Sequence, residues 1–153
     1  MGRTVKTLLK ATNENWGLTR VGDWKRTEFV LSHNGILHIK VYFLHPVVDV
    51  SIEVSSVDIA VIRENLKEII ANPVDATPSA LDGVAWSFEG YNDTGKQIFK
   101  WKLSYIYGIS SLENIGKILN SYIPEYERPE YTEFEIERYI TGIDAKGLLR
   151  ADL

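Results

Sequence analysis

The chain of 153 residues contains no cysteine, which excludes disulfide bonds, thiolate nucleophiles and zinc sites built on thiolates. It also lacks long hydrophobic runs, because apolar stretches such as residues 41–44 and 59–62 are far shorter than the roughly 20 residues that span a bilayer. The first ten residues have no compact apolar core of the kind that signal peptides carry. We therefore expect a cytoplasmic protein with no membrane partner.

An excess of positive charge is missing as well. The net charge is −4 and the pI is about 5.4, whereas nucleic-acid binding depends on many cations that meet phosphates. We expect no nucleic-acid partner. The charge is uneven along the chain, since residues 1–26 hold six cations against two acids, and residues 124–137 hold six glutamates against Arg128 alone.

The motifs that usually carry catalysis or cofactor binding are also absent. The sequence has no Gly-x-Ser-x-Gly elbow, no phosphate-binding P-loop and no dinucleotide fingerprint. Its histidines, at positions 33, 38 and 45, do not have the spacing of a metal site. Asp93-Thr94-Gly95 spells the aspartic-protease tripeptide, but it occurs once and falls in an expected hairpin turn. We expect no catalytic residue, no metal ligand and no cofactor.

What the sequence does contain is two similar segments, each with a hairpin followed by a helix. Asn34-Gly35 predicts a tight two-residue turn, and Asp93-Thr94-Gly95 predicts a longer one. Strict alternation marks the strand after each turn, and a third strand is expected over residues 47–54. In the second hairpin the alternation puts four apolar residues on one face and three polar residues on the other: Phe99, Trp101, Leu103 and Tyr105 against Lys100, Lys102 and Ser104.

Each hairpin leads into a Ser-Ser-apolar-acid motif that opens a stretch of helical periodicity. Ser55 and Ser110 are the predicted N-caps, with Asp58 and Glu113 as the partners of a capping box. Apolar residues then recur at three- and four-residue spacing, which predicts two amphipathic helices that pack on a sheet. The predicted apolar stripes are Ile59, Ile62, Leu66, Ile69 and Ile70 in the first helix, and Leu112, Ile115, Ile118, Leu119 and Tyr122 in the second.

These patterns predict an α+β fold. We expect a mainly antiparallel sheet from two β-β-(β)-α units, over about residues 26–71 and 83–123, with the helices packed on one face. The recurrence of order, turn and cap favours a real structural repeat. Residues 4–12 fit a short helix or an edge strand. The length fits a single domain over residues 1–153, with a C-terminal acidic extension over residues 124–153.

The acidic extension contains the candidate binding residues, because acids alternate with aromatic residues between positions 125 and 135. Tyrosine offers a large contact area, and carboxylates steer a basic partner. The structural alternative is that the aromatic rings pack on the sheet while the glutamates face water, and both arrangements can hold together. The partner-binding candidates are Glu125, Tyr126, Glu127, Glu130, Tyr131, Glu133 and Glu135.

The polar face of the expected sheet is a second candidate surface. If no helix covers it, it would form a basic plate with aromatic edges; the alternative is an ordinary solvated face. Its residues are His38, Lys40, Tyr42, Lys100 and Lys102.

The second unit resembles the immunity proteins encoded beside bacterial polymorphic and contact-dependent toxins. The resemblance rests on an Asp-Gly-x-x-Trp opening, a glycine turn and a short helix, and it covers a quarter to a third of the chain. It implies a cytoplasmic inhibitor that binds a cognate toxin stoichiometrically, and it assigns no functional residue. The matching stretches are Gly83-Val84-Ala85-Trp86-Ser87-Phe88, Gly95-Lys96, Tyr105-Ile106-Tyr107-Gly108-Ile109, Ser111-Leu112-Glu113 and Ile118-Leu119.

We therefore expect a non-catalytic protein-binding domain whose partner is a protein, such as a basic toxin domain. Two alternatives remain open. One is a small-molecule-binding protein or cryptic enzyme with an aromatic pocket between sheet and helices. The other is a self-associating structural domain that pairs through an open sheet edge, so the chain is expected as a monomer or weak homodimer. The expected pocket residues are Trp86, Phe88, Trp101 and Tyr105.

Overall fold

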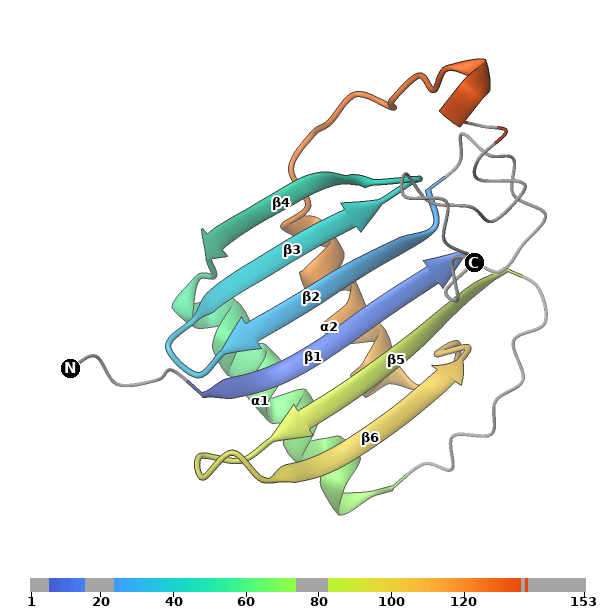
Figure 1. The fold of residues 1–153 in the computed structure, drawn as a ribbon. Coiled ribbons are helices and arrows are strands. Elements are labelled where there is room, and N and C mark those ends of the chain that lie inside the picture. The colour runs from blue at the N-terminus through green and yellow to red at the C-terminus, as the bar shows by residue number, and fades with distance from the viewer. Residues whose placement is uncertain (1–5, 16–23, 74–82, 136, 138–153) are drawn as a thin grey trace.

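A computed structural model describes residues 6–15, 24–73, 83–135 and 137. Six strands form one antiparallel sheet in the order β4-β3-β2-β1-β5-β6, and two helices lie on one face of it (Figure 1). The predicted α+β fold, with a mainly antiparallel sheet and helices on one face, is confirmed. The elements are β1 (Thr7–Asn15), β2 (Arg26–Ser32), β3 (Ile36–Tyr42), β4 (Pro46–Glu53), α1 (Ser56–Ala71), β5 (Val84–Tyr91), β6 (Gln97–Ser104) and α2 (Ser110–Ser121).

The two predicted hairpins are present, and their turns have the same geometry. The Gly35 N–H donates to the Ser32 carbonyl over 3.0 Å, and the Gly95 N–H donates to the Asn92 carbonyl over 3.0 Å. Both glycines have a positive φ, 88° and 87°, where a side chain is strained. Each turn therefore ends on a left-handed glycine, and the loop between β2 and β3 has three residues, 33–35. The expectation of a two-residue turn at Asn34-Gly35 was wrong.

Strand β1 lies at the centre of the sheet, so the expectation of a short helix or an edge strand at residues 4–12 was wrong. It pairs antiparallel with both β2 and β5. Those two strands therefore run in the same direction, and their hairpins extend from β1 to opposite sides, while both helices share one face (Figure 1). The second unit is therefore arranged as the mirror image of the first, and no rotation superimposes one unit on the other. The units share an order of elements but not a superimposable fold.

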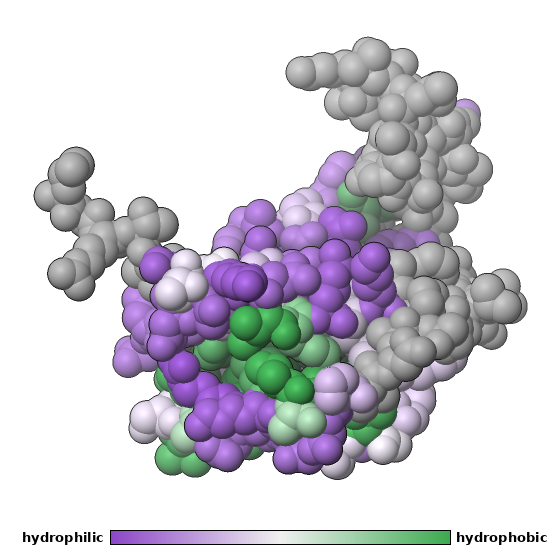
Figure 2. All heavy atoms as spheres, turned by 90° about the horizontal axis from the view of Figure 1, so that it is seen from below, coloured by the Kyte–Doolittle hydropathy of each residue, from purple (hydrophilic) through white to green (hydrophobic). Residues whose placement is uncertain are grey.

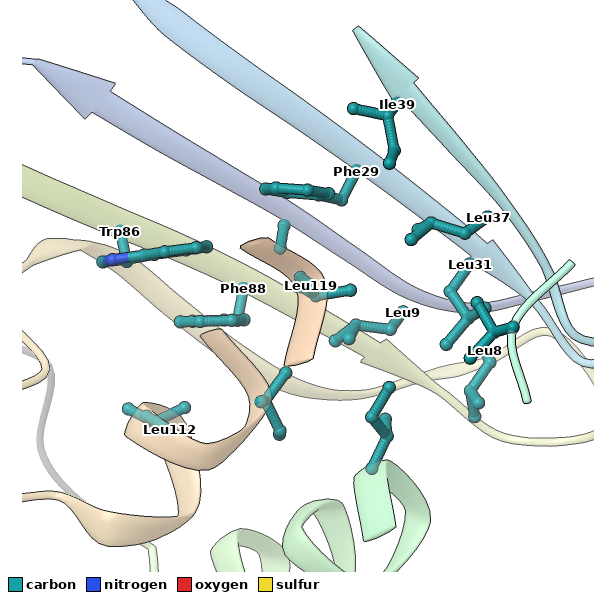
Figure 3. Close-up of a cluster of buried hydrophobic side chains, with 14 of the residues drawn as sticks. Leu8, Leu9, Phe29, Leu31, Leu37, Ile39, Trp86, Phe88, Leu112 and Leu119 are labelled. Atoms are coloured by element: carbon teal, nitrogen blue, oxygen red, sulfur yellow. The ribbon is translucent and has the colours of Figure 1, made fainter. Parts of the chain in front are cut away.

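The core fills the space between the sheet and the two helices (Figure 3). Phe29, Leu31 and Leu37 of the first hairpin and Phe88 of the second belong to one cluster, and all four are at most 1% exposed. The Trp86 ring stacks on Phe88, with centroids 5.2 Å apart, and lies 6.1 Å from the Phe29 ring. The helices contribute most of the predicted stripes: Ile62, Leu66 and Ile69 are buried in α1, and Leu112, Ile115 and Leu119 are buried in α2. Ile59, Ile118 and Tyr122 are half-buried, and the expectation that Ile70 belongs to the buried stripe was wrong, because it is 42% exposed.

The two helix starts differ, although their sequences are alike. Ser55 caps α1 as predicted, because its hydroxyl accepts from the Asp58 N–H over 3.1 Å. Helix α2 instead has Ile109 at the N-cap and no side-chain cap bond, so the predicted Ser110 cap was wrong. Glu113 accepts from the N–H of Gly108, one residue before the cap, over 3.2 Å. The carboxylate thus satisfies a backbone donor ahead of the helix.

The capping box predicted for α1 is completed from α2 rather than locally. The Ser55 N–H donates to the Tyr122 hydroxyl over 3.1 Å, and that hydroxyl donates to the Asp58 carboxylate. Tyr122 is the C-cap of α2. The contact therefore joins the end of the second helix to the start of the first.

The last part of β6 departs from simple alternation. The pairing of β5 with β6 shifts register between Phe88↔Trp101 and Trp86↔Ser104. Ser104, which alternation places on the polar face, is therefore turned inward and is 6% exposed. Within the described ranges, no helix has both the length and the apolarity that crossing a membrane requires. Residues 138–153 of the expected acidic extension lie outside the described residues.

Candidate functional site

The acidic segment follows α2 and ends near the turn that joins β3 to β4 (Figure 1, orange). Residues 124–135 and 137 of it are described, and only residues 133–135 and 137 are helical. All seven candidate residues therefore have a place in the structure. They divide into residues that hold the segment on the sheet and residues that face outward.

Two tyrosines hold the segment against the β3–β4 turn. The Tyr131 hydroxyl accepts from the Leu44 N–H over 2.9 Å, and its ring meets the His45 ring edge-on, with centroids 6.3 Å apart. The Tyr126 ring meets Phe43 edge-on at 6.0 Å, and burial raises the pKa of the Tyr126 hydroxyl. Phe43 and Leu44 are each 7% exposed, so the tyrosines pack on the rim of the core.

Glu135 makes its hydrogen bonds within the acidic segment. Its carboxylate accepts from the Thr132 N–H over 2.8 Å and from the Thr132 hydroxyl over 3.0 Å, while the Glu135 N–H donates back to that hydroxyl over 3.2 Å. This is a capping box at the start of a helical turn. The Thr132 N–H, then its hydroxyl, and less strongly the charge of His45, hold the pKa of Glu135 below its ordinary value. Glu135 thus has a structural role in this turn.

The other four glutamates, Glu125, Glu127, Glu130 and Glu133, are exposed. Phe134, next to Glu133, is 65% exposed, and Tyr126 is 39% exposed. The two arrangements expected from the sequence therefore occur together. The tyrosines pack on the sheet, and the segment that they anchor presents an acidic and partly aromatic outer surface. We call Glu125, Tyr126, Glu127, Glu130, Glu133 and Phe134 the acidic surface.

The polar face of the sheet is not a basic plate. Its cations lie beside acids. Arg26 and Glu28 form an ion pair along β2 at 3.1 Å, and Lys100 of β6 and Glu89 of β5 form one across two strands at 3.7 Å. His38 is hydrogen-bonded to Asp49. This hydrogen bond, and less strongly the charge of Lys40, lowers the pKa of the exposed Asp49 carboxyl. Exposed pairs of this kind contribute little stability. The face is charge-balanced, which removes the reason to regard it as an anion-binding surface.

The expected aromatic pocket forms only in part. Phe88 and Trp101 are 0% and 3% exposed and belong to the core, and Tyr105 does not line the pocket that includes Trp86. Trp86 does line a pocket of about 200 Å³, on the side of α2 that faces the start of β5. Sequence patterns did not indicate the other residues of this pocket: Val84, Ile106, Tyr107, Glu113, Gly116, Lys117 and Asn120. The signal that could have found them is the glycine inside an otherwise regular helix.

The edges of the sheet, β4 and β6, bear on self-association. Strand β6 has Lys100 and Lys102 exposed and two register shifts, and β4 begins with Pro46. Lysine, proline and irregular pairing are features by which edge strands avoid pairing with another chain. From below, where the β6 edge faces the viewer, hydrophobic side chains line a hollow framed by hydrophilic ones (Figure 2). The core therefore reaches the surface at this edge.

In the part of the chain that the structure describes, no three or more His, Asp or Glu side chains come together in a group that could hold a metal ion. No family model matches the chain, and neither a curated protein nor a solved structure matches it.

Proposed function

We propose that the chain is a non-catalytic protein-binding domain, an immunity-type inhibitor whose acidic surface docks on a basic toxin domain. The observation that carries the proposal is the anchoring of Tyr131 on the Leu44 N–H. A flexible acidic tail would lose conformational entropy on binding, whereas an anchored segment presents its carboxylates already positioned.

The composition of the acidic surface supports a protein partner. Carboxylates around a contact site steer a basic partner and accelerate association, while exposed aromatic rings supply the contact area that dominates binding energy. Phe134 and Tyr126 provide such rings beside four exposed glutamates. The resemblance of residues 83–119 to immunity proteins agrees in kind, since those proteins act by stoichiometric binding.

The test is to identify the product of the neighbouring gene, which the proposal expects to be a toxin, to titrate the chain with its toxin domain by calorimetry, and to measure growth protection. We expect a 1:1 complex with a dissociation constant of about 1 nM, typical of tight inhibitors. A variant with Glu127→Lys, Glu130→Lys and Glu133→Lys is expected to bind at least about 100-fold more weakly, mainly through slower association.

The matched control reverses three exposed glutamates elsewhere, with Glu53→Lys on β4 and Glu64→Lys and Glu68→Lys on α1. It changes the net charge equally, so it should retain binding within a few-fold. Equal loss in the two triple variants would mean that overall charge, not the acidic surface, governs binding. A neighbouring toxin that does not bind the unmodified chain would refute the proposed function itself.

A further inference from the structure

The pocket on α2 has the features of a ligand site that is separate from the acidic surface. Its floor is apolar, with Trp86 and Ile106 at 6% and 8% exposure, and Val84 beside them. A cavity of about 150 Å³ is enough to bind benzene. The volume of about 200 Å³ found here therefore accommodates one ring or one branched side chain.

Gly116 makes room for this floor. A Cβ atom at position 116 would lie 3.3 Å from Trp86 Cζ2 and 3.3 Å from Ile106 Cδ1. Glycine in a helix interior costs about 1 kcal/mol relative to alanine. Gly116 thus lowers the stability of the helix itself, but it allows α2 to pack closely on the sheet and leaves open space next to the Trp86 indole.

Polar groups of both signs surround the apolar floor. Glu113, Lys117 and Asn120 line the pocket from α2, at spacings that put them on one face of the helix. Glu113 uses one carboxylate oxygen to accept from Gly108, which leaves the second oxygen available. Among the described residues, no ion pair or side-chain hydrogen bond occupies Lys117 or Asn120, and Tyr107 at the rim is 77% exposed.

We propose that this pocket binds an apolar amino acid in its zwitterionic form. The side chain of the ligand packs on Trp86 and Ile106, its carboxylate meets the Lys117 ammonium and the Asn120 amide, and its ammonium meets the Glu113 carboxylate. A ligand with only one charge would place that charge beside a like charge on the same rim, because Glu113 and Lys117 are four residues apart. This site does not depend on the proposed inhibitor function.

The test is a titration of the purified chain with L-leucine and with L-phenylalanine, in which binding is measured by calorimetry and by ligand-observed NMR. For a ligand of about ten heavy atoms we expect a dissociation constant on the order of 0.1 mM. N-acetyl-leucine amide has the same side chain but no charge, and it should bind at least about tenfold more weakly. The absence of saturable binding of either amino acid up to about 10 mM, roughly a hundredfold above the expected constant, would overturn the proposal.

Variants locate the binding. Lys117→Ala, and Glu113→Gln, which keeps an acceptor for Gly108, should each weaken binding about fivefold or more, since each removes a charge-assisted contact. Lys96→Ala, in the turn before β6, is the matched control and should leave binding unchanged. Asn120→Trp should block the mouth of the pocket, with Ala60→Trp on α1 as its control. Equal binding of the neutral amide, or an effect of Lys96→Ala equal to that of Lys117→Ala, would refute the site.

Discussion

Gly35 and Gly95 occupy the same turn in surroundings that differ, which allows backbone strain and crowding to be separated. Their φ angles are 88° and 87°. A Cβ atom at Gly35 would lie 2.6 Å from Ile59 Cδ1 of α1, whereas at Gly95 the nearest atom would be Lys6 Cδ at 3.9 Å. Both alanine substitutions therefore strain the backbone equally, and only Gly35→Ala also crowds a side chain.

The magnitudes follow from this difference. A left-handed conformation costs a residue with a Cβ about 1–2 kcal/mol, so Gly95→Ala should lower the free energy of unfolding by that amount. Ile59 Cδ1 is the end of a half-buried side chain that can change rotamer, so crowding adds about 1 kcal/mol, the low end of the range for overpacking, and Gly35→Ala should cost about 2–3 kcal/mol in total. Ile59→Val removes Cδ1 itself, at about 0.5–1.5 kcal/mol alone. In that background Gly35→Ala should cost no more than Gly95→Ala.

Urea unfolding of the four single and double variants, monitored by circular dichroism, measures these terms at constant m-value. Each kcal/mol should also move the melting temperature by about 2–4 °C for a chain of this size. Equal costs for the two glycine substitutions would refute the reasoning. So would a double-mutant cycle in which Ile59→Val fails to recover the extra cost of Gly35→Ala.

Three further changes test the packing and the acidic segment. Tyr122→Phe should cost about 1 kcal/mol in urea unfolding, because it leaves a backbone donor and a carboxylate at the start of α1 without their partner; an unchanged midpoint would contradict this. Gly116→Ala should destabilise by about 1 kcal/mol, since crowding of the stacked Trp86 ring outweighs the gain in helix propensity, and a rise in stability would contradict it. The pKa of Glu135 is lowered in the folded chain from an ordinary value of 4.5, so its stabilising effect is present above that value and is lost as the pH falls through the folded one. NMR shifts of the segment should report this release in acid. Thr132→Val should reduce the pH dependence only in part, because it removes the hydroxyl but keeps the N–H, which lowers the pKa of Glu135 more strongly.

The sequence predicted those parts of the fold that depend on local patterns. Alternation in residues 36–43 predicted β3, and the stripe of Ile62, Leu66 and Ile69 predicted the buried face of α1, because side-chain periodicity follows directly from backbone geometry. The central place of β1 was not predictable in this way. Its partners β2 and β5 lie on both sides of it through pairings that are distant in sequence, and such pairings leave no local signal.

Caps show the same limit on a smaller scale. The two Ser-Ser motifs are alike in sequence, yet only Ser55 caps a helix. At α1, the Tyr122 hydroxyl joins Ser55 and Asp58, so a residue from the other helix takes part in the cap. At α2, Glu113 is drawn to the Gly108 N–H. Which polar atom satisfies a helix end therefore depends on what tertiary packing brings close, not only on the capping residue types.

For a related reason, the two candidate sites differ in how far the sequence alone could predict them. The acidic surface could be predicted because alternating acids and aromatic residues are unusual in any structural context, and packing only decided that Tyr131 anchors while the glutamates project. The pocket residues Glu113, Lys117 and Asn120 look like an ordinary solvated helix face, and Trp86 looks like an ordinary core residue. Gly116 lies between the helix-face residues and Trp86. Glycine lowers the stability of a helix relative to alanine, so its presence there indicates that the space beside it is needed. Two needs can explain that space, close packing on Trp86 and room for a ligand. Amino-acid binding that Asn120→Trp abolishes, in a chain that remains folded, would separate the second from the first.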